Sequence, residues 1–237
     1  MNERFRHDDN NENNNNNDNG YVPQDWGEAR FNALWQRCLA AVPVAVAAPY
    51  ARLAMLYGEP MRHYHTFDHI QHCLQEFDAI AGQLEHADAV EMALWFHDAI
   101  YVPGASDNEQ RSAQLFRSCA VGGDPSFCQR VDELIMVTTH RVPPHGHDER
   151  FMVDIDLSSF GQPWTEFLHD GQDLRAESAH SDDAGYYQSQ LRFLNSLYQR
   201  PNLFQTAFFQ ARYEQAARTN IERLIARLRA CGYGSSS

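Results

Sequence analysis

A largely apolar stretch, residues 90–96, runs directly into a histidine and an aspartate, His97 and Asp98. Leu94, His97 and Tyr101 are spaced as on one face of a helix, so we expect the pair to emerge from a helix packed into the core. An imidazole and a carboxylate are costly to bury unless something binds both of them. A divalent metal ion is a suitable partner, because neutral imidazole and carboxylate are both good ligands. An adjacent His-Asp pair also arises by chance, so the pair alone does not define a site.

Apolar side chains recur at helical spacing along the rest of the chain. Runs of alternating apolar and polar residues, which would indicate strands, are absent, and so are internal repeats. The sequence therefore predicts an all-α fold in a single domain. Besides the helix around residues 90–96, the expected helical segments cover residues 31–39, 50–57, 70–81, 108–116, 125–140, 187–197 and 203–228, and one further segment starts near residue 164.

Composition divides the chain into a polar tail, a folded domain and a short C-terminal tail. Residues 1–20 are rich in Asn, Asp and Glu. Such a segment buries too little apolar surface to offset its ordering entropy, so we predict that it is disordered. Residues 21–232 are long enough for one sizeable core, and residues 233–237 are expected to form a flexible tail.

The charge pattern narrows the classes of partner. A net charge of −13 argues against a surface that wraps nucleic acid or binds an anionic membrane. All 19 basic residues are arginines, which excludes Schiff-base lysine chemistry and the lysine of a P-loop. Arginine remains well suited to binding phosphate through two parallel hydrogen bonds.

The cysteines and the hydropathy pattern favour the cytoplasm. Five scattered cysteines without a C-x-x-C pair suggest reduced thiols rather than disulfides or a zinc knuckle. The sequence has no signal-peptide pattern and no apolar run long enough to span a bilayer. We therefore expect a cytoplasmic protein that does not bind membranes.

Further potential metal ligands lie on both sides of the His-Asp pair. His69 precedes the apolar face of the expected helix at residues 70–81, and Asp154 and Asp156 lie far downstream. Two imidazoles and two carboxylates are suitable ligands for Mn, Fe, Co, Ni or Zn, and they can also bind Mg. A ligand set of this kind leaves coordination positions on the metal open for water and substrate, as a catalytic site requires.

This His…His-Asp…Asp order resembles the HD superfamily of metal-dependent phosphohydrolases. Members of that family are all-helical and hydrolyse phosphate esters and anhydrides. The chain is most similar to a bacterial group of predicted HD phosphohydrolases, from which it departs at Thr66 and Ser178, where Asn and an aromatic residue are expected. The matching segments are Arg62–His65, His69–Ile70, Trp95–Asp98, Asn108–Glu109, Ser112–Ala113, Thr138–His140, Asp154–Leu157, Arg175–Glu177 and Ala217–Asn220.

The resemblance implies a ligand set for one divalent metal ion. Its residues are His69, His97, Asp98 and Asp156, with Asp154 as the alternative to Asp156. Two-metal members of the family carry further histidines soon after the His-Asp pair. Here the interval contains only His140, His145 and His147, all of them late, which favours a single ion.

The resemblance also implies catalytic and substrate-binding residues for a small phosphorylated metabolite, for which a nucleotide is one candidate. Asp98 would both ligate the metal and orient the attacking water. Glu109 would act as a general base or orient a ligand, although a carboxylate at a helix N-terminus also has a purely structural explanation. The candidate substrate-binding residues are Arg62, His65, His140 and Arg175. For the two arginines, structural ion pairs such as Arg175 with Asp173 or Glu177 are the alternative.

The conformation around the downstream aspartates decides which of them reaches the metal. Leu157 and Phe160 are three residues apart, which indicates a helix that starts near Asp154 or Ile155. Asp154 would then cap the helix and Asp156 would lie in its first turn. In an extended segment both carboxylates would lie on one face.

Two other functions fit the same motifs. A regulatory or binding protein could keep the metal site without turnover. An oxygenase with a diiron centre on the same fold would need extra histidine ligands soon after Asp98, which the sequence lacks.

Overall fold

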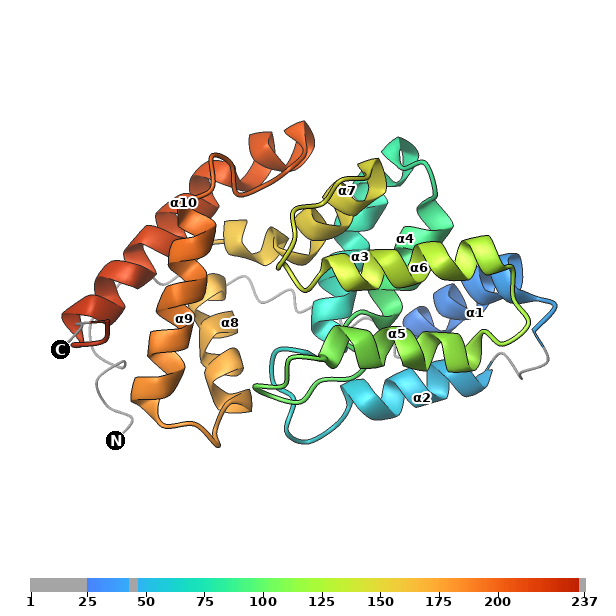
Figure 1. Cartoon of the computed structure of the whole chain (residues 1–237), viewed down its shortest axis with the longest axis horizontal. Helices are drawn as coiled ribbons and strands as arrows, with labels where there is room; N and C mark the ends of the chain where they lie inside the picture. The colour runs from blue at the N-terminus through green and yellow to red at the C-terminus, as the bar shows by residue number, and fades with distance from the viewer. Residues whose placement is uncertain (1–24, 43–46, 235–237) are drawn as a thin grey trace.

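The computed structural model describes residues 25–42 and 47–234, and in these ranges its regular secondary structure is entirely helical (Figure 1). This confirms the predicted all-α class. No helix in these ranges has the length and apolar character needed to cross a membrane. The predicted disordered tail, residues 1–20, lies outside the described residues. The helices are α1 (Asp25–Leu39), α2 (Ala47–Tyr57), α3 (Phe67–Ile80), η1 (Ala81–Gln83), α4 (Ala87–Phe96), α5 (Asn108–Cys119), α6 (Pro125–Val137), α7 (His147–Asp156), η2 (Ser158–Gly161), α8 (Trp164–Glu177), α9 (Asp183–Tyr198) and α10 (Ala207–Ala230), where η marks a 3₁₀-helix.

Helix α4 forms the centre of the first group of helices, α1–α7. It packs against α1, α3, α5, α6 and α7, and residues 89–96 are all buried. A helix that is apolar on all sides is stable only when it is surrounded by others. Its one buried charge, Glu91, is paired with Arg30 of α1, whose Nε lies 2.6 Å from Glu91 Oε1. The core helix predicted before His97 is therefore present.

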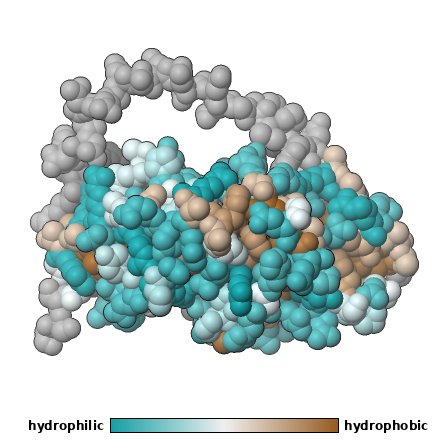
Figure 2. Space-filling model, turned by 90° about the horizontal axis from the view of Figure 1, so that it is seen from above, coloured by the Kyte–Doolittle hydropathy of each residue, from teal (hydrophilic) through white to brown (hydrophobic). Residues whose placement is uncertain are grey.

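Helices α8–α10 form a second group, which lies to one side of the first (Figure 1). The 3₁₀-helix η2 links the two groups, because it follows α7 directly and packs against α8 and α10. The side-chain amide of Asn220 on α10 donates hydrogen bonds to the carbonyls of Phe160 and Gln162, at 2.9 and 2.8 Å. The face of the molecule in Figure 2 is mostly hydrophilic, with apolar side chains gathered near its middle.

Three helix ends meet inside the first group. Helix α3 begins after Thr66, whose hydroxyl accepts a hydrogen bond from the backbone N–H of Asp68. Helix α4 ends with His97 as its C-terminal cap residue, and α7 ends at Asp156. The three helices pack against one another. Their ends therefore bring together residues that are far apart in sequence.

The predicted helix start near Asp154 is wrong, because both aspartates lie at the C-terminal end of α7. The helix starts earlier, after Gly146, where the Glu149 carboxylate accepts hydrogen bonds from the backbone N–H groups of His145 and Gly146. The i,i+3 spacing of Leu157 and Phe160 reflects η2, since side chains three residues apart align on a 3₁₀-helix.

Other predicted boundaries also shift. Helix α6 ends at Val137, three residues before His140. Helix α10 starts at Ala207 rather than at Leu203, and Thr206 caps it by accepting from the N–H of Phe209. Tyr233, assigned to the flexible C-terminal tail, instead packs its ring 4.6 Å from that of Tyr187. All five cysteines are free thiols, as their scattered positions predicted.

Candidate metal centre

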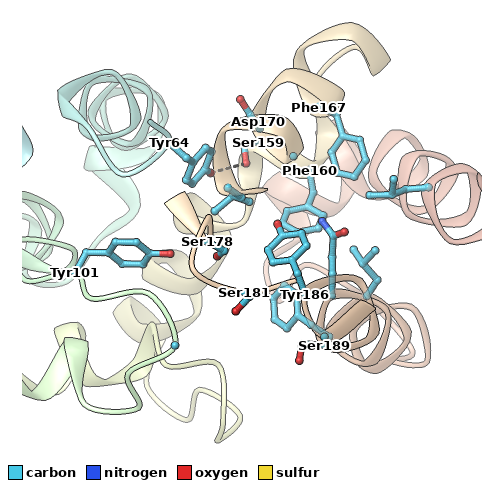
Figure 3. Close-up of a pocket in the computed structure, with 18 of the residues that line it drawn as sticks. Tyr64, Tyr101, Ser159, Phe160, Phe167, Asp170, Ser178, Ser181, Tyr186 and Ser189 are labelled. Atoms are coloured by element: carbon cyan, nitrogen blue, oxygen red, sulfur yellow. Dashed lines mark hydrogen bonds between the residues drawn. The ribbon is translucent and has the colours of Figure 1, made fainter. Parts of the chain in front are cut away.

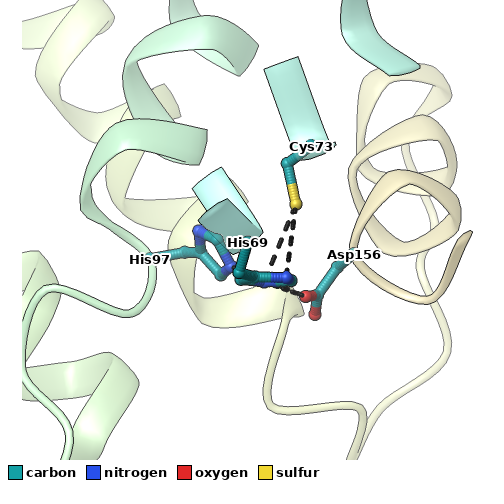
Figure 4. A group of neighbouring side chains, drawn as sticks. All are labelled: His69, Cys73, His97 and Asp156. Carbon is teal, nitrogen blue, oxygen red and sulfur yellow. Dashed lines mark hydrogen bonds and ion pairs between the residues drawn. The ribbon is translucent and has the colours of Figure 1, made fainter. Parts of the chain in front are cut away.

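Four side chains from the three helix ends converge on one point. His69 Nε2 lies 3.3 Å from His97 Nε2, 3.4 Å from Asp98 Oδ2 and 3.5 Å from Asp156 Oδ1. His97 Nε2 lies 3.0 Å from Asp98 Oδ2 and 3.5 Å from Asp156 Oδ1. Figure 4 shows the two rings and the Asp156 carboxylate directed toward one another. The structure thus brings together all four residues of the implied ligand set.

This geometry suits a metal ion. Nitrogen and oxygen ligands about 2.0–2.2 Å from one ion are about 3.0–3.5 Å from their neighbours, which is the spacing found here. With both imidazoles neutral, the two carboxylates leave two negative charges for a divalent cation to balance. A buried thiol, Cys73 Sγ, lies 3.7 Å from His69 Nε2, and His69, Cys73, His97 and Asp156 form a group that could hold a metal ion.

The fixed orientation of His97 favours metal binding. Its Nδ1 lies 2.9 Å from the backbone carbonyl of Leu94. Because a carbonyl only accepts, Nδ1 must carry the hydrogen. In the neutral ring the lone pair is then on Nε2, which faces the other three ligands.

Without an ion, the four groups stabilise one another as charges. Burial alone would lower the pKa of His97, but the carboxylates of Asp98 and Asp156 raise it well above its usual value. Burial would likewise raise the pKa of Asp156, yet hydrogen bonds from His140, His69 and His97 hold it well below the usual value. A bound cation would take the place of the imidazole protons in this arrangement.

The two downstream aspartates have different surroundings. Asp156 lies in the cluster, whereas Asp154 points toward the start of α10. The fully buried Asp154 carboxylate accepts hydrogen bonds from Gln205 N at 2.7 Å, Thr206 N at 2.8 Å and Thr206 Oγ1 at 2.7 Å. Asp154 therefore holds α10 against α7.

His140 contacts the cluster through a ligand carboxylate. Its Nε2 lies 2.8 Å from Asp156 Oδ2, the oxygen that does not face the two histidines. The backbone of His140 has φ 53°, a left-handed conformation that is uncommon for residues other than glycine. This conformation turns the ring back toward α7. His140 is thus placed to orient Asp156.

The two candidate phosphate-binding arginines are engaged with the protein itself. The Arg62 side chain is 1% exposed, and its guanidinium donates to the carbonyls of Asp98 at 2.7 Å and Ala99 at 2.8 Å. Arg175 donates to Asp183 Oδ1 at 2.7 Å and to two backbone carbonyls, so its ion-pair partner is neither Asp173 nor Glu177. Arg62 thus fixes the turn that carries Asp98, and Arg175 fixes the α8–α9 connection.

Two further candidates differ in their distance from the cluster. The ring of His65 lies 6.2 Å from that of His69 and stacks at 3.9 Å on the ring of Tyr101. Glu109 lies in the first turn of α5, and no hydrogen bond or ion pair within the described ranges joins it to the cluster. His145 and His147 lie on the surface at the start of α7.

Sequence reasoning missed Cys73 and Glu177 as parts of the site. Cys73 lies four residues after His69 on α3, a spacing that places both on one helix face and that could have revealed it. Glu177 Oε1 accepts hydrogen bonds from the backbone N–H groups of residues 63–65, each at 2.9 Å, and its Oε2 lies 2.6 Å from His65 Nδ1. Nothing in the local sequence indicates this contact, which spans more than a hundred residues.

Comparison with known protein families, characterised proteins and solved structures finds no significant match to this chain. Fold and site together define an all-α protein with a buried His/Cys/Asp cluster that could bind a metal ion.

Proposed function

We propose that the protein is a metal-dependent phosphohydrolase of the HD type that acts on a small phosphorylated metabolite. The observation that carries this proposal is the convergence of His69, His97, Asp98 and Asp156. The sequence resemblance to HD phosphohydrolases selects the same four residues. A divalent ion bound by them would acidify a water molecule and polarise a phosphoryl oxygen.

The residues of the chain have separate tasks in this proposal. His69 and His97 supply neutral nitrogen ligands from rigid helix ends, and Asp98 and Asp156 supply charge. Asp98 meets His69 and His97 through Oδ2, and no hydrogen bond or ion pair within the described residues engages its other oxygen, which can therefore orient the attacking water. His140 holds the second oxygen of Asp156 and so fixes how that carboxylate meets the ion.

The donor set also bears on the identity of the ion. Two imidazoles favour Mn, Fe, Co, Ni or Zn over Mg, which prefers oxygen ligands and retains its water. The nearby thiol of Cys73 strengthens this preference, because thiolates bind softer metals. We propose a single transition-metal ion in the centre.

A phosphate-release screen tests the proposed reaction. The purified protein, loaded with Mn²⁺, Co²⁺, Zn²⁺ or Mg²⁺ in turn, is incubated with nucleotides, sugar phosphates and simple phosphate monoesters. We expect metal-dependent release of inorganic phosphate, at least about a hundredfold faster than by the His97→Ala variant. A protein that binds the ion but releases phosphate from none of these compounds would instead support the regulatory alternative.

A further inference from the structure

A cavity of about 420 Å³ lies between the α8–α9 hairpin and the segments that follow α2 and α4 (Figure 3). Tyr64 and Tyr101 come from the first group of helices, and the remaining walls come mainly from η2, α8 and α9. A cavity of this volume suits a small organic molecule.

The cavity adjoins the metal centre through its aromatic wall. The ring of Tyr64, which lines the cavity, lies 4.9 Å from that of His69. The Tyr64 hydroxyl is hydrogen-bonded to Ser159 Oγ at 3.0 Å, which fixes the ring between the two spaces. A molecule whose phosphate reached the metal centre could therefore place its other end in the cavity.

The lining of the cavity does not suit an anion. No arginine lines it, and its titratable lining residues besides the tyrosines are Asp170 and His180. Six of the lining side chains are aromatic, which favours a flat ring that can stack or pack edge-on. The aromatic lining residues are Tyr64, Tyr101, Phe160, Phe167, Tyr186 and Phe193.

The Asp170 carboxylate lacks a donor. It makes no hydrogen bond or ion pair within residues 25–42 and 47–234, and burial raises its pKa to about 6. The residue is half-buried and lines the cavity. A ligand that displaced water from this carboxylate would have to replace the lost hydrogen bonds, because an acceptor withdrawn from water is costly to leave unsatisfied. A ligand with an N–H donor meets this need.

We propose that this cavity binds the organic part of the substrate, and that this part is a flat ring with at least one N–H donor. The inference rests on the proposed phosphohydrolase function and adds the class of substrate. The ring packs against the aromatic wall, its donor bonds to Asp170, and the phosphate lies at the metal centre.

Three phosphate esters with alcohol leaving groups of similar reactivity test the preference. They are 3-aminobenzyl, benzyl and cyclohexylmethyl phosphate. We expect kcat/KM to fall about tenfold when the amino group is removed and again when the flat ring is replaced. Equal kcat/KM for benzyl and cyclohexylmethyl phosphate would overturn the inference.

A variant of the lining shows whether Asp170 meets the amino group. Asp170→Leu should reduce the preference for the amino ring, whereas Glu166→Leu, at an exposed acidic residue one turn away on α8, should keep it. A preference for the amino ring that survives in Asp170→Leu, with its folding checked by circular dichroism, would contradict the assignment.

A binding measurement separates this inference from the proposed reaction. Calorimetry with 3-aminobenzyl alcohol should show binding to the wild type and to His97→Ala, and weaker binding to Asp170→Leu. Binding of the alcohol without hydrolysis of any ester would refute the hydrolase and leave the cavity assignment standing. Hydrolysis without any binding of the alcohol or preference for a ring would refute the cavity assignment alone.

Discussion

Asp156→Asn is expected to lose at least about a hundredfold in metal affinity and to abolish metal-dependent phosphate release. The change replaces one of two charged ligands with a neutral amide and removes the charge that faces His69, His97 and His140. The fold should persist, because the buried apolar side chains of Met152, Val153 and Ile155 still hold α7 in the core. Metal affinity is measured by titration of the demetallated protein.

Asp154→Asn is the matched control, two residues away. This variant should keep the metal but lose about 1–3 kcal/mol in its free energy of unfolding. Both oxygens of the Asp154 carboxylate now accept hydrogen bonds from Gln205 and Thr206. In asparagine one of these oxygens becomes an NH₂ group, which cannot accept, so at least one of the donors loses its partner. Loss of metal from Asp154→Asn together with full occupancy in Asp156→Asn would show that the two assignments are reversed.

Glu177→Gln should lower the free energy of unfolding by about 3 kcal/mol at neutral pH. The Glu177 side chain is fully buried and accepts three backbone N–H groups and the ring of His65, which ties the end of α8 to the segment before α3. Glutamine keeps one oxygen but places an NH₂ group near the remaining donors. Urea unfolding followed by circular dichroism measures the change, with the exposed Glu166→Gln on the same helix as the control.

The same carboxylate makes stability depend on pH. Burial would raise the pKa of Glu177, but the hydrogen bonds from His65 and the backbone of residues 63–65 bring it below its usual value of 4.5. A depressed pKa in the folded state stabilises the protein above pH 4.5, and this contribution is lost as the pH falls through the folded-state pKa. The wild type should therefore lose more stability in acid than Glu177→Gln does. An identical acid dependence in the two proteins would contradict this explanation.

The central helix and the ligands next to it could be predicted because their signals are local. Residues 90–96 are apolar except for Glu91, which is characteristic of a buried helix, and His97 and Asp98 follow directly. The helix expected from residue 125 also begins there, where the Asp124 carboxylate accepts a hydrogen bond from the N–H of Phe127.

The register of α7 and the contacts of Arg62 could not be predicted, because the first has an ambiguous local pattern and the second depends on distant parts of the chain. The spacing of Leu157 and Phe160 fits an α-helix and a 3₁₀-helix equally well, and the capping contact at Gly146 that starts α7 lies before the apolar stretch. Arg62 was expected to bind phosphate, but its guanidinium donates hydrogen bonds to the backbone carbonyls of Asp98 and Ala99, which lie 36 and 37 residues further along the chain.

The cavity is another feature that only the fold reveals. Its lining joins Tyr64 and Tyr101 with residues of α8 and α9, and no motif connects these segments. Asp170 is unremarkable in sequence, and only its place in the cavity wall, without a hydrogen-bond donor, marks it as a binding group.

Elemental analysis after metal removal and reconstitution tests the central claim, that the converging helix ends bind one metal ion. We predict one equivalent of a divalent transition-metal ion per chain in the wild type, and near-complete loss in His69→Ala and His97→Ala. The control is His72→Gln, on the same helix as His69, whose ring bonds to Ser158 rather than to the cluster. This variant should keep its metal. A wild-type protein that retains no metal, or a His97→Ala variant that retains a full equivalent, would contradict the account.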